Sequence, residues 1–286
     1  MEYLELRNGK KIPQIGFGVF RMDDLERCEQ AVLEAIQAGY RLFDTAAVYG
    51  NEKAVGNAIR KSGIDRSEFF ITSKLWASDY GNPEKGIEQS LENLGTDYID
   101  LYLLHQPVGD VYNAWRGLEK EYREGKLKAI GVSNFYPDRL EDLLMHAEIP
   151  PMVNQVELHP FFQQNQALSF MQDHDIIPMA WGPLAEGSQG IFRNEVLTKI
   201  GKAHHKTPAE VALRWNLERG CVVIPGSVRP DHMKEDMNIL DFALTEEEKK
   251  EITALDHDHS QIIDHRDPCV VRMLSRYHLP EQEETR

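Results

Sequence analysis

The sequence has little positive charge, few cysteines and no long apolar run. Its 32 Lys and Arg residues stand against 47 Asp and Glu residues, which gives a formal net charge of −15. This balance argues against nucleic acid or an anionic membrane surface as the main partner, because both bind basic patches. No apolar run approaches the roughly 20 residues that span a bilayer. The acidic N-terminus, Met1–Glu5, also differs from a basic-then-apolar secretory signal.

The cysteines predict neither a disulfide framework nor a metal centre. Cys28, Cys221 and Cys269 are widely spaced and form no pair of the metal-binding type. We therefore expect reduced thiols in a cytoplasmic protein. The run His257-Asp258-His259 carries metal-binding side chains, but it lies in a polar segment and is expected to be solvated. A metal hydrolase is thus disfavoured, and no metal site is predicted.

Short apolar segments alternate with amphipathic helical segments at intervals of about 24 to 30 residues, with one longer interval before the last strand. The expected strands are 15–20, 41–45, 69–76, 99–105, 129–134, 153–158, 176–181 and 221–225. The expected helices are 25–38, 52–61, 84–94, 111–123, one after Pro137, 166–174, 211–219, 231–240 and 246–255. Strict alternation is typical of a parallel sheet, and eight such units close a barrel of roughly 250 residues.

An open doubly wound sheet is the alternative, but no Pro/Gly/Ser-rich linker divides the chain. We therefore predict an α/β protein with a single (β/α)8 TIM-barrel domain over residues 1–286, with extra helices after the last strand. Residues 1–13 form an expected hairpin, because Asn8-Gly9 suits a tight turn. Residues 257–286 are expected to be a C-terminal loop and tail: 257–278 show no clean period, and 280–286 are polar and expected to fray.

Helix-start signals accompany several of these segments. Thr207 with Glu210 and Thr245 with Glu248 have the spacing of capping boxes. Asn51 is placed to cap the helix that begins near Glu52, and Asn82 precedes a proline at a first helical position.

Polar side chains close several of the expected strands. Asp44, Lys74 and His105 end successive strands, and Tyr49 lies on the loop after the first of them. In a parallel barrel these ends share the face where catalysis occurs. A lysine that closes an apolar strand is costly to bury unless it is paired, and Asp44 is the expected partner. Each residue alone is compatible with an ordinary barrel rim or a helix cap, whereas the combination indicates a catalytic site.

Two other functions fit a lysine at a barrel strand end. A Schiff-base aldolase needs a neutral Lys74, which the neighbouring Asp44 and Tyr49 disfavour. A non-enzymatic protein that keeps the barrel to sense a cofactor or to bind a partner is also compatible with the fold.

Longer motifs point to one family. The segments 43–46 with 49–52, 72–76, 103–107, 131–135, 154–160 and 224–227 occur in the order seen in aldo-keto reductases. The chain resembles this family over nearly its whole length, and most closely the bacterial branch that includes 2,5-diketo-gluconate reductases and general aldehyde reductases. The resemblance implies a monomeric oxidoreductase that reduces aldehydes or ketones to alcohols by hydride transfer from NADPH or NADH, with a small carbonyl compound as substrate.

The resemblance also implies roles for the catalytic residues. Tyr49 would donate the proton, and its unperturbed pKa of about 10 makes it a weak acid at neutral pH. A nearby Lys74 ammonium would favour the phenolate form and so make Tyr49 a better donor, while Asp44 keeps Lys74 charged. His105 would orient the carbonyl oxygen and help to stabilise its developing charge.

Cofactor and substrate residues follow from the same resemblance. Ser133, Asn134 and Gln155 would bind the nicotinamide carboxamide, and Trp181 would stack on the ring. The full set implied for the cofactor is Gly18, Val19, Phe20, Asp44, Ser133, Asn134, Gln155, Trp181, Gly182, Pro183, Leu184, Gly226, Ser227, Val228, Arg229, His232, Glu235 and Asp236, with residues 182–184 along the pyrophosphate. The set implied for the substrate is Phe20, Tyr49, Trp76, His105 and Gln106, with the segment near Asp267-Pro268.

The chain departs from the family pattern where the adenosine end of the cofactor would bind. Gly226 replaces a lysine typical of NADPH-specific relatives, His232 stands where arginine is usual, and Asp236 where asparagine is common. A 2′-phosphate carries close to two negative charges and is normally held by Arg or Lys. Ser227, Arg229 and a helix N-terminus remain as contacts. The hypothesis is a weakened NADPH preference, with NADH usable.

Overall fold

The computed structural model describes residues 2–277, and the tail 280–286 that was expected to fray lies outside them. The strands are β1 Tyr3–Glu5, β2 Lys11–Pro13, β3 Gly16–Gly18, β4 Leu42–Asp44, β5 Phe70–Leu75, β6 Leu101–Leu104, β7 Ile130–Ser133, β8 Val153–Glu157, β9 Ile177–Trp181 and β10 Val222–Val223. The α-helices are α1 Leu25–Ala38, α2 Glu52–Lys61, α3 Pro83–Leu94, α4 Val111–Arg123, α5 Pro137–Leu144, α6 Asn165–Asp173, α7 Glu195–His204, α8 Pro208–Glu218, α9 Pro230–Met237, α10 Glu246–Thr253 and α11 Pro268–Arg276.

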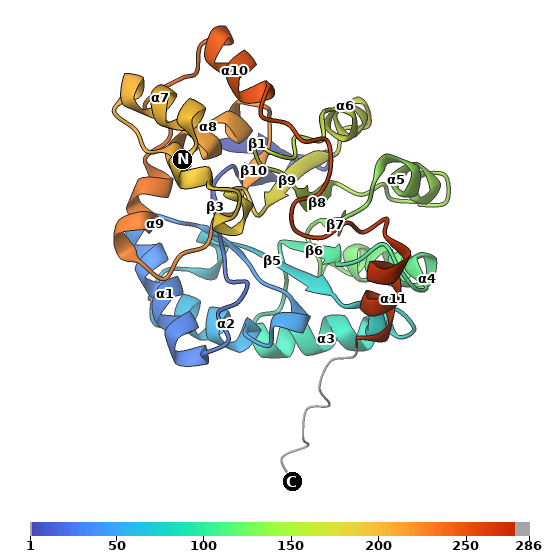
Figure 1. Cartoon of the computed structure of the whole chain (residues 1–286). Coiled ribbons are helices and arrows are strands. Elements are labelled where there is room, and N and C mark those ends of the chain that lie inside the picture. The colour runs from blue at the N-terminus through green and yellow to red at the C-terminus, as the bar shows by residue number, and fades with distance from the viewer. Residues whose placement is uncertain (1, 278–286) are drawn as a thin grey trace.

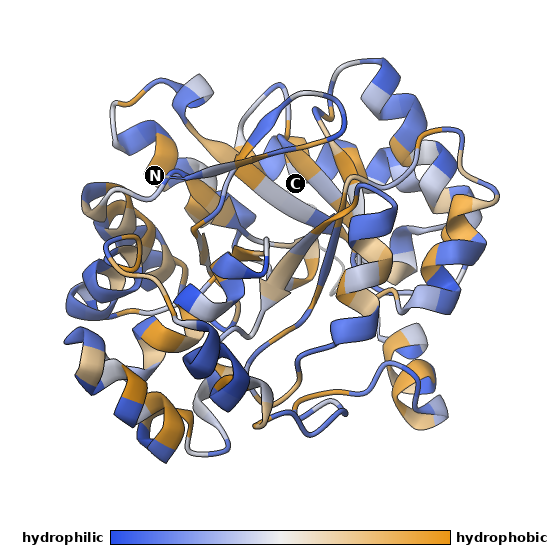
Figure 2. Cartoon of the chain, turned by 90° about the horizontal axis from the view of Figure 1, so that it is seen from above, coloured by the Kyte–Doolittle hydropathy of each residue, from blue (hydrophilic) through white to orange (hydrophobic). Residues whose placement is uncertain are grey.

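Strands β3 to β10 form one parallel sheet in chain order, surrounded by helices (Figures 1 and 2). The sheet closes on itself where Ile15 bridges Val223 in parallel, and the Gly18 N–H donates to the Pro225 carbonyl at 3.0 Å. The predicted (β/α)8 barrel is therefore confirmed. Strands β4 to β8 are buried along their whole length, because the barrel covers one face of each strand with its interior and the other with the helices.

The N-terminal hairpin covers the end of the barrel that lies opposite the strand C-termini. Leu6 and Ile12 pack into the apolar cluster inside the barrel, together with residues of the parallel strands. Asn8 donates to the carbonyl of Lys128, and Arg7 to that of His174, both just ahead of a strand. With this end closed by apolar side chains, the open face is the one that carries the strand C-termini.

The helix-start signals were partly right. Both capping boxes are present, at Thr207 with Glu210 and at Thr245 with Glu248. Asn82 precedes Pro83 at the first position of α3, as predicted, although its side chain makes no cap hydrogen bond. The Asn51 side chain makes no cap hydrogen bond either, so the prediction that it caps α2 was wrong. The Asn51 amide is instead buried, where it accepts from the Thr45 hydroxyl at 2.7 Å and donates to the Val19 carbonyl at 2.9 Å. It thereby ties together the two loops that follow β3 and β4.

Two helices lie where none was predicted. Helix α7, capped by Asn194, fills the long interval between β9 and β10. Helix α11 lies within the segment that was expected to be irregular, and Asp267 caps it by accepting from the Cys269 N–H at 2.7 Å. In Figure 1 the red segment after α10 passes β8 and β7 and ends in α11. Among residues 2–277, every helix is too short or too polar to cross a membrane.

Gly56 on α2 permits a close helix contact that a larger residue would block. A Cβ atom built at this position would lie 2.0 Å from the backbone oxygen of Leu94, at the end of α3. Alanine normally stabilises a helix by about 1 kcal/mol relative to glycine. We expect Gly56→Ala to be destabilising instead. It should lower the free energy of unfolding by about 2 kcal/mol, because the backbone of α2 or of Leu94 must move to make room for the methyl group.

Urea denaturation measures this effect. Gly81→Ala is the control, because a Cβ at Gly81 meets nothing within 4 Å. A Gly56→Ala protein as stable as the wild type would show that α2 and α3 separate without cost.

Candidate active site

A buried ion pair occupies the centre of the barrel mouth. Lys74, on β5, donates from Nζ to Asp44 Oδ1 at 2.6 Å and to the Thr45 carbonyl at 2.8 Å. The Lys74 side chain is 1% exposed and the Asp44 side chain 4%. Gln155 reaches from β8 and donates to the second carboxylate oxygen at 2.7 Å. The two predicted partners are thus joined, and each Asp44 oxygen has a donor.

Burial acts on the two charges in opposite directions. It lowers the pKa of the Lys74 ammonium and raises the pKa of the Asp44 carboxyl, and their mutual attraction opposes both shifts. The charged forms are retained because the pair is close and hydrogen-bonded on several sides. Separating it would leave an uncompensated buried charge.

Tyr49 is positioned by a short 3-10 turn, Ala47–Tyr49, that follows β4 and ends at Gly50 in the left-handed conformation. Lys74 Nζ lies 5.1 Å from the centre of the Tyr49 ring. His105 stands edge-on to the same ring, with centroids 5.6 Å apart. The four side chains that the sequence singled out for catalysis therefore share one site at the strand C-termini.

The pKa of Tyr49 differs from the sequence-based expectation. Burial raises it well above its usual value, and the negative charges of Asp44 and Glu186 raise it further. This shift is opposite in direction to the one expected from Lys74, because burial and the two carboxylates all disfavour a phenolate. Tyr49 consequently holds its proton at neutral pH.

His105 is neutral at the same pH. Burial lowers the pKa of its imidazole well below the usual value, and the nearby Lys74 and His265 add to the effect. Its Nδ1 atom is buried and has no hydrogen-bond partner within residues 2–277. A neutral imidazole has one N–H donor and one acceptor nitrogen, so it can offer a hydrogen bond without adding charge.

The residues expected to bind a carboxamide form a connected polar group on β7, β8 and β9. Asn134, whose φ of 66° is left-handed, accepts from the Trp181 indole N–H at 2.7 Å and donates to the His105 carbonyl at 3.1 Å. The Ser133 hydroxyl donates to the Gln155 carbonyl at 2.9 Å. These amide and hydroxyl groups, which lie next to the Trp181 indole N–H, are the ones that the resemblance assigned to the nicotinamide carboxamide.

Aromatic rings border the other side of Tyr49. Phe20 is 53% exposed, and its ring centroid lies 5.0 Å from that of Tyr49. Trp76 is edge-on to His105 at 5.1 Å, and its indole N–H donates to the Tyr277 carbonyl just after α11. Gln106 is buried, and its side-chain oxygen accepts from the Asn134 amide at 3.4 Å. Its side chain therefore points toward the polar residues that were expected to bind the nicotinamide carboxamide.

Comparison with known proteins identifies the family of this chain. Residues 14–257 match the model of the aldo/keto reductase family. The chain is 47% identical to the 9,11-endoperoxide prostaglandin H2 reductase of Trypanosoma cruzi, over 88% of this chain and 91% of that protein. It is 46% identical to the glyoxal reductase of Bacillus subtilis, over 89% and 93%. It is 40% identical to the methylglyoxal reductase DkgA of Escherichia coli K12, over 88% and 93%.

Solved structures agree. A Bombyx mori aldo-keto reductase in complex with NADP superimposes with a TM-score of 0.87 at 30% identity, over 92% of this chain and 95% of that one. An aldo-keto reductase from a deep-sea metagenome library of the Medee basin gives 0.89 at 40% identity, over 92% and 98%. This chain belongs to the aldo/keto reductase family. It is an NAD(P)H-dependent oxidoreductase, which resolves the alternative of a non-enzymatic barrel.

At the far end of the reductase's predicted cofactor site, the arginine that precedes α9 is engaged in an ion pair. Arg229 pairs with Asp231, with Nε 3.2 Å from Oδ1. The Ser227 hydroxyl accepts from the Arg229 N–H at 3.1 Å, at the start of α9. Gly226 cannot be replaced without movement, because a Cβ there would lie 2.4 Å from the Gly18 carbonyl oxygen. The glycine is thus required by the close approach of the β3 and β10 ends.

Sequence reasoning missed two arginines around this site. Arg21 pairs with Glu186 at 2.9 Å, which joins the loop after β3 to the loop after β9. Arg27, on α1, donates to the Val228 carbonyl at 3.0 Å and brings a cation to the predicted adenosine end. Neither arginine lies in one of the family motifs. Each contacts a residue far away in sequence, and only the closed barrel brings these segments together.

Asp236, at the same end, is buried, with 6% of its surface exposed. Burial, with Glu235 and Glu210 adding to it, raises its pKa to about 7. The unfolded chain loses this proton near pH 4. Stability should therefore fall as pH rises from about 4 to about 7, where only the unfolded state releases the proton, and level off above that window.

Asp236→Asn should remove this loss. We expect its stability gain over the wild type to be near zero at pH 4 and to reach about 4 kcal/mol at pH 8, at about 1.4 kcal/mol for each unit of pKa. Urea unfolding at the two pH values measures it, with the exposed Asp173→Asn as the control. A gain that does not grow with pH would contradict the assignment.

Proposed function

We propose that this reductase converts small dicarbonyl aldehydes, of the glyoxal and methylglyoxal type, to hydroxycarbonyl products. The observation that carries the proposal is the convergence of Tyr49, Lys74 and His105 at one buried point of the barrel mouth. Two relatives reported above are named for glyoxal and methylglyoxal. The close aromatic borders at Phe20 and Trp76 suit a compact substrate.

A bound reduced nicotinamide supplies the hydride. The carbonyl oxygen of the substrate would accept hydrogen bonds from the Tyr49 hydroxyl and from the neutral His105 imidazole. As the hydride reaches the carbonyl carbon, negative charge grows on that oxygen, and the proton moves from the phenol to it. Both neighbours are donors in their neutral forms, which the raised pKa of Tyr49 and the lowered pKa of His105 provide.

Lys74 would act when charge appears, rather than on the resting phenol. Two of its N–H groups are committed to Asp44 and the Thr45 carbonyl, and its ammonium lies beside the Tyr49 ring. A fixed positive charge in a buried site stabilises the phenolate that remains after proton transfer, without reorganisation at the moment of reaction.

For the cofactor, we propose that NADH is accepted beside NADPH. His232 brings no permanent charge, and Arg229 is already neutralised by Asp231. Arg27 and the N-terminus of α9 remain to attract a 2′-phosphate. The attraction of these groups for a 2′-phosphate is weaker than the attraction of a site with two unpaired cations.

The proton-donor assignment predicts the behaviour of Tyr49→Phe. Loss of the hydroxyl should lower kcat for methylglyoxal by about a thousandfold, in the range of general acid catalysis. NADPH affinity should stay within about threefold of the wild type, because no charge changes. NADPH absorbance follows turnover and fluorescence titration follows binding, with Tyr112→Phe on α4 as the control. Unchanged turnover would show that the proton comes from another group.

The cofactor proposal predicts a ratio of kcat/KM for NADPH over NADH below about a thousandfold, which corresponds to some 4 kcal/mol. His232→Arg should raise that ratio by about tenfold by adding one charged donor. His232→Gln, which adds no charge, is the matched control. Gly226→Lys is a poor test because its Cβ would meet the Gly18 carbonyl. A wild-type ratio above the threshold would contradict the proposal.

A further inference from the structure

A buried carboxylate that the catalytic proposal does not use lies at the end of β8. Glu157 is 3% exposed, two residues beyond Gln155. Its Oε1 accepts from His159 Nε2 at 3.1 Å and from the Gln261 backbone N–H at 2.8 Å. Its Oε2 accepts from the Ser260 hydroxyl at 2.6 Å. Every one of these partners donates, which is the arrangement that a carboxylate needs.

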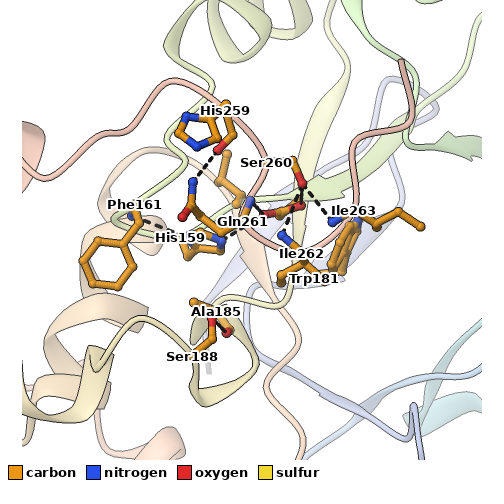
Figure 3. Close-up of polar contacts among 12 residues, drawn as sticks. His159, Phe161, Trp181, Ala185, Ser188, His259, Ser260, Gln261, Ile262 and Ile263 are labelled. Atoms are coloured by element: carbon orange, nitrogen blue, oxygen red, sulfur yellow. Dashed lines mark hydrogen bonds and ion pairs between the residues drawn. The ribbon is translucent and has the colours of Figure 1, made fainter. Parts of the chain in front are cut away.

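Two of the partners belong to the C-terminal strap, defined here as residues 257–267. The strap joins α10 to α11 and lies almost wholly beyond the part of the chain that matches the family model. The Ser260 oxygen also accepts from the backbone N–H groups of Ile262 and Ile263, at 3.3 and 2.9 Å (Figure 3). The turn of the strap is therefore built around the contact between Ser260 and Glu157.

The strap rests on the segment that is predicted to hold the cofactor. Ile262 Cδ1 lies 3.2 Å from the position of a Cβ at Gly182, so it covers the backbone that follows Trp181. His265, which is buried, stands edge-on to the Trp181 indole with centroids 6.4 Å apart. The indole N–H is fixed on another side by Asn134. Trp181 and Gly182 are thus held between the barrel rim and the strap.

Few other polar contacts hold the strap to the barrel. Within residues 2–277, its first residue, His257, donates its backbone N–H to the Phe161 carbonyl at 3.0 Å. Several later hydrogen bonds, such as those of Arg266 with Asp264, stay inside the strap. The Glu157 carboxylate is ionised, because hydrogen bonds from His159, Ser260 and Gln261 lower its pKa in spite of burial. Hydrogen bonds to a charged acceptor are about twice as strong as neutral ones.

We propose that Glu157 is a positioning residue that acts through Ser260 and Gln261 to hold the strap against Trp181 and Gly182, and that this latch slows dissociation of the nicotinamide nucleotide. Release requires the stacked indole and the backbone after it to move away, and the strap opposes that motion. The inference rests on the proposed cofactor role of Trp181.

Ser260→Ala in the full-length protein tests the latch, because it removes one hydrogen bond from the strap and leaves the barrel residues intact. We expect NADPH to dissociate on the order of tenfold faster, the effect of one lost hydrogen bond to a charged group. Stopped-flow measurement of tryptophan fluorescence gives the rate. Glu157→Ala should act in the same direction, while Ser260→Thr, which keeps the hydroxyl, should restore the rate to within about twofold.

Two further variants separate positioning from general stability. Ser275→Ala on α11 loses a hydroxyl that bonds only within its helix, to the Val271 carbonyl, and should leave the rate unchanged. In a Trp181→Ala background, Ser260→Ala should change the rate by less than about twofold, because the strap has lost its target. Urea unfolding of each variant reports folding separately.

The outcomes distinguish this inference from the proposed function. A wild type that binds NADPH and reduces carbonyls, with Ser260→Ala and Glu157→Ala releasing NADPH at the wild-type rate, overturns the latch alone. A Ser260→Ala protein that is less stable to urea but releases NADPH normally overturns it as well. A wild type that fails to bind NADPH overturns both.

Discussion

The buried pair of Lys74 and Asp44 is the constraint on which the barrel mouth depends. Each ion would cost several kcal/mol to bury alone, and removing one partner of such a pair typically costs 3–5 kcal/mol. The cost is offset here by direct hydrogen bonds and by Gln155, which reaches the second Asp44 oxygen from β8. Because β8 and β4 are four strands apart in the sheet order, the carboxylate connects opposite walls of the barrel. The same contact that offsets the charges therefore fixes the geometry of the site.

That pair also contributes to the protonation states of its neighbours, after burial. An ammonium close to His105 adds to the effect of burial and keeps the imidazole neutral, while the Asp44 carboxylate adds to burial in keeping Tyr49 protonated. The site thus holds two neutral donors beside one fixed ion pair. In the proposed mechanism, such an arrangement would hold a fixed positive charge close to the atoms on which negative charge develops.

The sequence was sufficient to place the strands and to predict that Asp44, Tyr49, Lys74 and His105 lie close together, since parallel strands that close into a barrel bring their C-terminal ends to one face. The sequence was insufficient where the structure of a segment, or the role of a side chain, depends on contacts with distant parts of the chain. Helix α11 has its Leu274 in an apolar cluster with Trp76 and Val108, which are far away in sequence. Asn51 had the spacing of a cap, but its amide is used to join two loops. The pKa of Tyr49 depended on burial, which spacing does not measure.

The proposed catalytic residues and the residues that border them lie on different parts of the chain, so that the borders of the site can change while its chemistry is kept. The central residues lie on strands or on the turn directly after one, where the closed sheet fixes them. The strap and α11 come after the last strand, but each reaches the site through one indole. The Trp76 N–H is bound by the Tyr277 carbonyl at 2.7 Å, and the same ring borders His105. Trp181 meets the strap in a similar way. Changes in the C-terminal segment can therefore alter the borders of the pocket without disturbing the ion pair below it.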